Sequence, residues 1–166
     1  MAKLMGASPV IATASTQEKL DLAESLGADV LINYTEEDWP EQVREATDGA
    51  DVDIILEMVG GDFIQKNLRC LNAFGRMVVY GAASGERGSL VPMDLMRKNQ
   101  VVAGFFLPQI MGRPELFGPS LEEILDWVSS GELKLTIGAR YPLEKAREAH
   151  DALEGRRTTG KILLNP

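Results

Sequence analysis

Two short apolar stretches near the start of the chain are each followed by polar side chains that suit a phosphorylated ligand. The first stretch is followed by Thr13 and Ser15, with Lys19 shortly after, and the second ends at Asn33 and Tyr34. Hydroxyl and ammonium groups bind phosphate oxygens, and a tyrosine ring offers a flat surface on which an adenine can stack. These residue types therefore favour a nucleotide-binding site.

The absence of an acid beside them indicates which kind of nucleotide. A dinucleotide site that selects an unphosphorylated ribose normally carries an Asp or Glu at this place, where it binds the 2′-hydroxyl. Residues 13–16 (TAST) include no acid. A lysine, hydroxyls and a tyrosine instead suit a ribose 2′-phosphate with an adenine nearby. The same residues also fit a plain helix cap, a solvated lysine and a half-buried tyrosine, and the pattern alone leaves both interpretations open.

These side chains belong to an expected strand, helix and strand. The apolar run Val10–Ala12 is short and bounded by turn formers, which is typical of a strand buried on both faces. Ser15 and Glu18 form a capping-box pattern that predicts a helix start, and Gly27 stands where a helix is expected to end. Asp29–Asn33 is then a second strand. Together they predict one parallel unit with its crossover helix.

The chain continues as alternating strands and helices. We predict strands at Val52–Glu57, Arg76–Tyr80 and Val101–Leu107, and helices at Trp39–Ala46, Phe63–Leu71 and Pro92–Asn99. Small or polar residues follow four of the strands, after Ala14, Asn33, Glu57 and Tyr80. This recurrence predicts a doubly wound parallel sheet with a ligand crevice at the carboxyl ends of its strands. No complete G-x-G-x-x-G phosphate fingerprint occurs in the chain.

Beyond Pro108 the pattern changes. Ser120 and Glu123 form a second capping-box pattern, which predicts a helix that ends at Gly131. A short strand at residues 133–137, a helix at Pro142–Leu153 and a last strand at Lys161–Leu164 are expected to follow. His150 is the only histidine, and its apolar helix neighbours favour a packed or half-exposed structural residue over a catalytic base.

Composition excludes several classes of protein. The net charge is −8 and the 17 basic residues are scattered, which argues against a general nucleic-acid binder. The one cysteine, Cys70, is expected to pack in the interior, and a single cysteine excludes a disulfide framework or a multi-cysteine zinc site within the chain. It also fits a reducing cytoplasm. Because no apolar run approaches the roughly 20 residues that span a bilayer, we expect no membrane partner.

The order of these motifs resembles the medium-chain dehydrogenase/reductases, and within them the zinc-independent quinone oxidoreductase branch. The resemblance is carried by AKLMGA from Ala2, VIATASTQEKLDLAESLGADVLINY from Val10, VDIILEMVGGD from Val52, NAFGRMVVYGAASG from Asn72 and YPLEKAREAHDALEGRRTTGKILL from Tyr141. The last stretch is the most specific of the five. The resemblance covers essentially the whole chain.

This resemblance implies an α/β fold with a partial Rossmann-type domain at residues 1–107. Residues 108–166 would form a helical and strand segment that returns to a separate catalytic domain. In the family, a first strand and a glycine-rich loop precede a segment like Ala2–Ala7, which looks like the last turn of a helix closed by Gly6. We therefore expect a doubly wound parallel sheet that lacks this strand and loop, as in the C-terminal half of a reductase.

The activity implied by the resemblance is hydride transfer from NADPH to a quinone or an α,β-unsaturated carbonyl. The family's 2′-phosphate contacts fall on Ser15, Lys19 and Tyr34, in agreement with the chemistry of the residues themselves. Its other cofactor contacts fall on Val59, Gly60, Gly81, Ala82, Phe105, Phe106, Leu107 and Arg156. No catalytic residue and no metal ligand is carried over to this chain.

Two alternative functions stay open. One is a nucleotide-binding or structural fragment without turnover, and the other is an enoyl reductase module of a lipid- or polyketide-making enzyme. The chain by itself is expected to be inactive and to bind dinucleotides weakly, because it lacks the loop that holds the pyrophosphate. We also expect a homodimer, because Val101–Leu107 is an uncharged edge strand and the family pairs its subunits at this edge.

Overall fold

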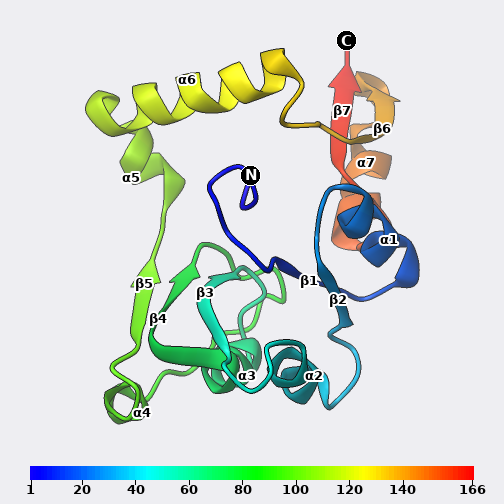
Figure 1. Cartoon of the computed structure of the whole chain (residues 1–166). Helices are drawn as coiled ribbons and strands as arrows, with labels where there is room; N and C mark the ends of the chain where they lie inside the picture. The colour runs from blue at the N-terminus through cyan, green and yellow to red at the C-terminus, as the bar shows by residue number, and fades with distance from the viewer. The chain divides into compact units, whose positions relative to one another are not determined.

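The computed structural model describes the whole chain, Met1–Pro166, and divides it into two compact units. The larger unit is Ser8–Phe117, and the smaller unit combines Met1–Ala7 with Gly118–Pro166 (Figure 1). The boundary lies within helix α6 (Pro114–Ser130), further along the chain than the predicted domain boundary after residue 107. The assignment of the two parts to a nucleotide domain and a catalytic domain stays a prediction.

The larger unit opens with the predicted strand, helix and parallel strand. β1 (Ile11–Ala14) pairs in parallel with β2 (Val30–Asn33), and α1 (Gln17–Ser25) connects them. Gly27 follows α1 with a φ of 101°, a left-handed conformation that glycine adopts without steric cost. The predicted parallel unit is therefore confirmed.

The cap of α1 differs from the prediction by one residue. Thr16, not Ser15, is the N-cap: its backbone is extended, with φ −142° and ψ 151°, and its hydroxyl accepts the Lys19 amide at 3.4 Å. Both residues carry the hydroxyl that an N-cap needs, so spacing in the sequence does not separate them. Ser15 stays in the loop between β1 and the helix.

Three further strands form a parallel sheet in the order β3-β4-β5. The strands are β3 (Val52–Glu57), β4 (Leu71–Val79) and β5 (Val101–Gly104), and the intervening helices are α2 (Trp39–Ala46), α3 (Phe63–Cys70) and α4 (Pro92–Met96). β4 begins earlier than expected and contains a bulge, because Val52 pairs with Leu71 whereas Ile54 pairs with Arg76. The predicted elements are thus present in the expected order.

β5 is shorter than the predicted strand Val101–Leu107. It ends at Gly104, and Leu107 begins helix α5 (Leu107–Met111). Pro108 explains the difference, because its fixed φ and missing N–H suit the first turn of a helix. Phe105 still donates its amide to the Val79 carbonyl at 2.8 Å, so the chain follows β4 for one residue beyond the strand.

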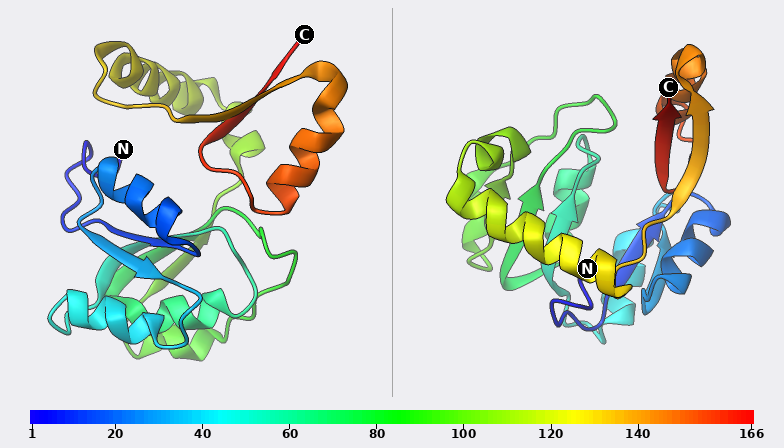
Figure 2. Two further views of the ribbon diagram at one scale, coloured as in Figure 1. Left: turned by 90° about the vertical axis from the view of Figure 1, so that its right-hand side faces the viewer. Right: turned by 90° about the horizontal axis from the view of Figure 1, so that it is seen from above.

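The parallel sheet of the larger unit comes in two pieces, β1-β2 and β3-β4-β5. Figure 2 shows α1 on one side of β1 and β2, with α2 and α3 on the other. In the Rossmann strand order 3-2-1-4-5-6, the strands equivalent to β1 and β3 flank the first strand of the domain. The predicted partial Rossmann-type sheet without its first strand is therefore confirmed.

Two hydrophobic clusters hold the helices against these strands. The first contains the buried residues Ile32, Trp39, Val43 and Cys70, and the second contains Ile64, Leu68, Leu71 and Met77. Ile55 of β3 packs against both clusters. The core is therefore continuous through the middle of β3, although the sheet itself is interrupted.

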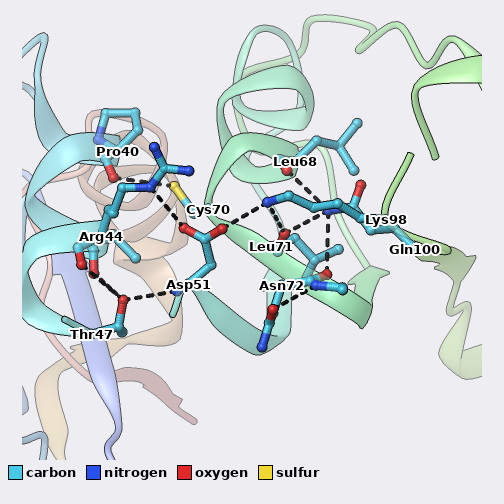
Figure 3. A network of polar contacts seen from close by, with 12 residues as sticks. Pro40, Arg44, Thr47, Asp51, Leu68, Cys70, Leu71, Asn72, Lys98 and Gln100 are labelled. Atoms are coloured by element: carbon cyan, nitrogen blue, oxygen red, sulfur yellow. Dashed lines mark hydrogen bonds and ion pairs between the residues drawn. The ribbon is translucent and has the colours of Figure 1, made fainter. Parts of the chain in front are cut away.

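A polar network around Asp51 ties the start of β3 to α2 and to the residues before β5 (Figure 3). The Asp51 carboxylate accepts hydrogen bonds from Lys98 Nζ at 2.7 Å and from Arg44 Nε at 3.3 Å. Lys98 Nζ also donates to the Leu71 carbonyl at 3.0 Å. Burial alone would raise the pKa of Asp51, but the hydrogen bonds and positive charges of Lys98 and Arg44 outweigh it and lower the pKa.

The smaller unit contains one more parallel pair. β6 (Ile137–Pro142) and β7 (Lys161–Asn165) are connected by a 3₁₀ turn (Leu143–Lys145) and α7 (Ala146–Glu154). The strand predicted at residues 133–137 is wrong in position, because the residues that find a partner in β7 begin only at Ile137. None of the helices has the length and apolar character that crossing a membrane requires.

For the helix predicted from Ser120 to Gly131, the predicted start is wrong and the predicted end is confirmed. α6 begins at Pro114 and contains Ser120, so the capping-box pattern at that residue does not mark its start. Pro114 provides an earlier start signal, since proline suits the first helical turn. Gly131 follows the helix with a φ of 80°, and this predicted helix end is confirmed.

The first residues of the chain form a single helical turn. The Ala7 amide donates to the Ala2 carbonyl at 3.0 Å, and the Gly6 amide donates to the Lys3 carbonyl at 2.9 Å. Gly6 has a φ of 88°. This pair of bonds around a left-handed glycine is the pattern that ends a helix, so the predicted helix end is confirmed.

Candidate functional site

Backbone hydrogen bonds join the loops that follow β3 and β4. The Ala83 amide donates to the Met58 carbonyl at 2.8 Å, and the Ser84 amide donates to the Val59 carbonyl at 2.9 Å. The Ser84 hydroxyl adds a second bond to the Val59 carbonyl at 2.7 Å. The structure thereby brings together four of the predicted cofactor residues, Val59, Gly60, Gly81 and Ala82.

Two glycines allow these loops to approach each other. Gly60 has a φ of 81°, and a Cβ atom at this position would lie 2.8 Å from the Glu86 carbonyl oxygen. A Cβ atom at Gly81 would lie 3.1 Å from the Met58 carbonyl oxygen. A side chain at either position would therefore push the two loops apart.

A buried carboxylate shapes the loop after β3. Glu57 is 3% exposed, and its Oε1 accepts the amides of Val59 at 2.5 Å and Gly60 at 2.8 Å. Its other oxygen accepts a hydrogen bond from the Asn67 side chain on α3. From the sequence, Glu57 is predicted only as the last residue of a strand. An acid at the end of a strand, three residues before a glycine, was the signal that could have identified it.

Ser15 and Tyr34 each directly follow the carboxyl end of a strand, β1 and β2, and these two ends lie side by side. The Tyr34 amide donates to the carbonyl of the residue before Ser15 at 3.1 Å, and Lys19 lies in the first turn of α1. The Asn33 side chain has a local structural role at the end of β2. Its side-chain oxygen accepts the amide of Thr35 at 3.0 Å and the hydroxyl of Thr35 at 2.8 Å, so it organises the turn after β2.

A ring contact joins this place to the loop after β3. The Tyr34 ring stands edge-on to the Phe63 ring, with centroids 5.3 Å apart and an interplanar angle of 87°. Phe63 is the first residue of α3, and its other neighbour is Trp39, with ring centroids 5.8 Å apart. Phe63 was predicted only as the start of a helix. Its position just after the Gly60–Gly61 pair was the available signal.

The remaining predicted contacts occupy two other places. Phe105, Phe106 and Leu107 follow β5 and are 43%, 65% and 49% exposed. Because β4 and β5 are parallel, these residues and Gly81 lie at the same edge of the sheet. Arg156 belongs to the smaller unit, where it follows α7 with a φ of 55°.

The single cysteine and the single histidine of the chain belong to different units. Cys70 is 2% exposed, as predicted, and burial raises the pKa of its thiol to about 12. His150 is exposed on α7, so the expectation that it would be packed or half-exposed is wrong. No three side chains of His, Cys, Asp or Glu are grouped as metal ligands.

Comparison with known proteins identifies the family. A family model described as zinc-binding dehydrogenase matches residues 26–164, which is most of the chain. The chain belongs to this zinc-binding dehydrogenase family. Its resemblance to the medium-chain dehydrogenase/reductases, and to their quinone oxidoreductases in particular, is confirmed.

Two curated members of the family illustrate the similarity. A 2-haloacrylate reductase of a Burkholderia species is 36% identical over 99% of this chain and 50% of its own length. Quinone oxidoreductase 1 of Escherichia coli strain K12 is also 36% identical, over 99% of this chain and 51% of its own. The chain thus spans about half the length of the curated relatives that it matches.

Solved structures of family members match the fold closely. The Escherichia coli quinone oxidoreductase complexed with NADPH has a TM-score of 0.90 and 34% identity, over 99% of this chain and 51% of the other. A mycobacterial protein complexed with NADPH has a TM-score of 0.91 and 33% identity, over 99% of this chain and 52% of the other. The fold of this zinc-binding dehydrogenase chain is therefore shared along its whole length.

Proposed function

We propose that this chain is the cofactor-binding part of an NADPH-dependent reductase of quinones or other α,β-unsaturated carbonyls. The observation that carries the proposal is the position of Ser15 and Tyr34 directly after the paired strands β1 and β2, with Lys19 in the first turn of α1 and no acid among residues 13–16. The NADPH in the solved Escherichia coli quinone oxidoreductase supports the same cofactor. The 2-haloacrylate reductase supports reduction of an activated double bond as the wider reaction class.

The residues at the ends of β1 and β2 suit a ribose 2′-phosphate and its adenine by their charge, their hydrogen-bond donors and an aromatic ring. Lys19 provides a positive charge and Ser15 a hydroxyl donor, and hydrogen bonds to an ionised phosphate are about twice as strong as neutral ones. Tyr34 offers its ring to the adenine, and the Phe63 ring packs against the Tyr34 ring at nearly a right angle, with a centroid distance of 5.3 Å. The N-terminus of α1 adds a favourable dipole for the anion.

The other predicted contacts orient the rest of the dinucleotide. We assign Val59 and Gly60 to contacts with a ribose of the cofactor. Gly81 and Ala82 are assigned to contacts with the nicotinamide ribose and the pyrophosphate. The backbone at Phe105–Leu107 is assigned to the carboxamide, and the assignment of Arg156 to the cofactor rests on the family resemblance alone. Bound NADPH supplies the hydride, and these residues supply its orientation and electrostatic environment. No residue of this chain acts as a catalytic acid or base.

The chain alone is proposed to bind dinucleotides much more weakly than a complete reductase and to show no turnover. Without a glycine-rich loop it lacks the backbone amides that normally hold the pyrophosphate. An enoyl reductase module would use the same residues but would receive its substrate from a carrier partner. A purely nucleotide-binding role without chemistry is the remaining alternative, and it predicts that adding a catalytic domain yields no activity.

We further propose a cytoplasmic location and a homodimer. The cytoplasm is consistent with a single, buried and unpaired cysteine. The proposed dimer forms through the edge of the sheet at residues 101–107, where Val101 is 47% exposed and Phe106 is 65% exposed. An apolar strand edge of this kind favours pairing with a second copy.

A chimera tests the proposed activity. In it, this chain replaces the part of Escherichia coli quinone oxidoreductase 1 that it matches, and circular dichroism verifies folding. The chimera should oxidise NADPH with 1,4-benzoquinone and should prefer NADPH to NADH. A folded chimera that binds NADPH without oxidising it would favour the non-catalytic alternative. A folded chimera that prefers NADH would contradict the cofactor assignment.

A further inference from the structure

A pocket with a volume of about 470 Å³ lies among α2, α3, α4 and the residues that precede β5. All of its lining residues belong to the larger unit. Small-molecule sites in proteins have volumes of about 300–1,000 Å³, so this pocket has room for more than a single inorganic ion. None of the predicted cofactor residues lines it.

The pocket lies at the edge of the sheet where the strands begin. Lys98 and Gln100 line the pocket and precede β5, and Asp51, which binds Lys98, directly precedes β3. The predicted cofactor residues Gly81 and Phe105 instead follow β4 and β5. Because β3, β4 and β5 are parallel, their beginnings share one edge of the sheet and their ends share the other. The pocket therefore belongs to the edge opposite these two cofactor residues.

Positive charge is concentrated in this pocket, although the chain as a whole has a net charge of −8. Four cationic side chains line it: Arg44, Arg69, Arg97 and Lys98. Two carboxylates, Glu41 and Asp94, line it as well, and Asp51 binds two of the cations from behind. Four positive charges thus stand against three negative ones. Guanidinium groups match the geometry of phosphate oxygens, so the lining favours a phosphate group.

The arginines of the pocket have donors to spare. Figure 3 shows Arg44 and Lys98 on opposite sides of the Asp51 carboxylate. Arg44 binds Asp51 through Nε alone, at 3.3 Å, so both terminal nitrogens of its guanidinium group still lack an acceptor. Arg69 and Arg97 are exposed and make no side-chain hydrogen bond or ion pair within the chain. A phosphate in the pocket would supply acceptors to all three guanidinium groups.

The same pocket also offers acceptors. Gln100 is only 9% exposed, and its side-chain nitrogen donates to the carbonyl of Leu71 at 2.6 Å, whereas its side-chain oxygen accepts no hydrogen bond. The carboxylates of Glu41 and Asp94 have no hydrogen-bond donor within the chain either. Carboxylate oxygens repel a bare anion but accept hydrogen bonds from hydroxyl groups. The lining therefore matches a ligand that carries hydroxyl groups in addition to a phosphate.

We propose that this pocket binds a small phosphate monoester that carries hydroxyl groups, as a sugar phosphate does. The phosphate lies among Arg44, Arg69 and Arg97, and the hydroxyl groups donate to Glu41, Asp94 and the side-chain oxygen of Gln100. Lys98 adds positive charge from a fixed position, because Asp51 and the Leu71 carbonyl hold its ammonium group at 2.7 and 3.0 Å. The ligand binds reversibly, and no bond is made or broken.

The experiment titrates the intact 166-residue chain with ribose 5-phosphate at low ionic strength, followed by calorimetry and by residue-resolved NMR. Ribose and inorganic phosphate are titrated in parallel. We expect saturable one-to-one binding of ribose 5-phosphate, roughly tenfold or more tighter than that of inorganic phosphate, and no binding of ribose. The resonances that shift should belong to α2, α3, α4 and residues 97–100.

Two variants and one control test the location. Arg69→Gln and Arg97→Gln each remove a guanidinium group from the pocket and should weaken binding of ribose 5-phosphate roughly tenfold or more. Arg147→Gln, on α7 of the smaller unit, should bind as the parent does. All three arginines are exposed, so the variants should fold.

Four results would overturn the proposal. They are no saturable binding of ribose 5-phosphate, equal binding by all three variants, equal affinity for inorganic phosphate, and shifts only at residues 13–34. The last result would instead place the phosphate beside Lys19, at the proposed nucleotide site. Because no nucleotide is present and the pocket's own residues report binding, the outcome is independent of the proposed function.

Discussion

The Gly60 amide donates a 2.8 Å hydrogen bond to the buried carboxylate of Glu57. The bond fixes a turn in which Gly60 has a φ of 81° and in which the next loop passes within contact distance. The geometry of the two joined loops is thus set from inside the protein, by an acid that faces away from solvent.

Removing the Glu57 carboxylate should destabilise the chain. Glu57→Ala leaves the Val59 amide and the Asn67 side chain without their acceptor, and hydrogen bonds to charged groups contribute about 1.5–3 kcal/mol each. We expect a loss of about 2–4 kcal/mol in the free energy of unfolding, measured in urea. Glu24→Gln, on the exposed side of α1, is the matched control and should change stability little. Equal stability of the two variants would contradict the role given to Glu57.

Adding one methyl group at Gly60 should separate the loops. Gly60→Ala forces a left-handed backbone on alanine and places its Cβ 2.8 Å from the Glu86 carbonyl, and strain of this kind costs about 1–3 kcal/mol. Gly104→Ala is the control, because nothing lies within 4 Å of a Cβ at that position. Thermal unfolding should show a lower midpoint for the first variant only. A Gly60→Ala protein as stable as the parent would show that the loops are not closely joined.

The stability of the chain should fall in acid partly through Asp51. The pKa of this carboxyl is lowered in the folded state, so its contribution is present above the pKa of the unfolded chain. It is lost as the pH falls through the lower, folded pKa. Asp51→Asn should therefore reduce stability at pH 7 and flatten its decline below pH 4, as measured by urea midpoints. Glu45→Gln, on the exposed surface of α2, should keep the slope of the parent.

A charge on the outer edge should weaken self-association. Ala103 lies in the middle of β5, the edge strand of the β3-β4-β5 sheet, and a lysine there opposes pairing with a second strand. Sedimentation at micromolar concentration should show a dimer or larger assembly for the parent and a shift toward monomer for Ala103→Lys. A monomeric parent chain would exclude the proposed dimer.

The sequence was sufficient where a pattern depends on local chemistry. The parallel order of strands, the buried Cys70, and the helix ends at Gly6 and Gly27 all follow from apolar runs and from backbone conformations that glycine favours. It was insufficient where neighbouring residues share the same chemistry. Ser15 and Thr16 are equally good caps, and only the extended backbone of Thr16 decides between them.

Contacts between distant elements were also beyond the sequence. Glu57 reaches Asn67 because α3 packs back against β3, and Tyr34 reaches Phe63 because the end of β2 lies near the start of α3. No spacing rule connects such pairs. The prediction of a strand at residues 133–137 was wrong for a related reason, since β6 forms only where β7 supplies a partner.

The central claim is that Ser15, Lys19 and Tyr34 recognise a ribose 2′-phosphate, and one titration of the chain tests it directly. Adenosine 2′,5′-bisphosphate and adenosine 5′-monophosphate are compared by residue-resolved NMR, with Lys19→Ala as the test variant and Lys134→Ala as the control. Loss of one charge-assisted bond to phosphate is worth about 1.5–3 kcal/mol, or roughly 10- to 150-fold in affinity. We predict tighter binding of the bisphosphate by that factor, shifts at the three residues, and loss of the preference in Lys19→Ala only. Equal affinity of the parent chain for both nucleotides would contradict the account.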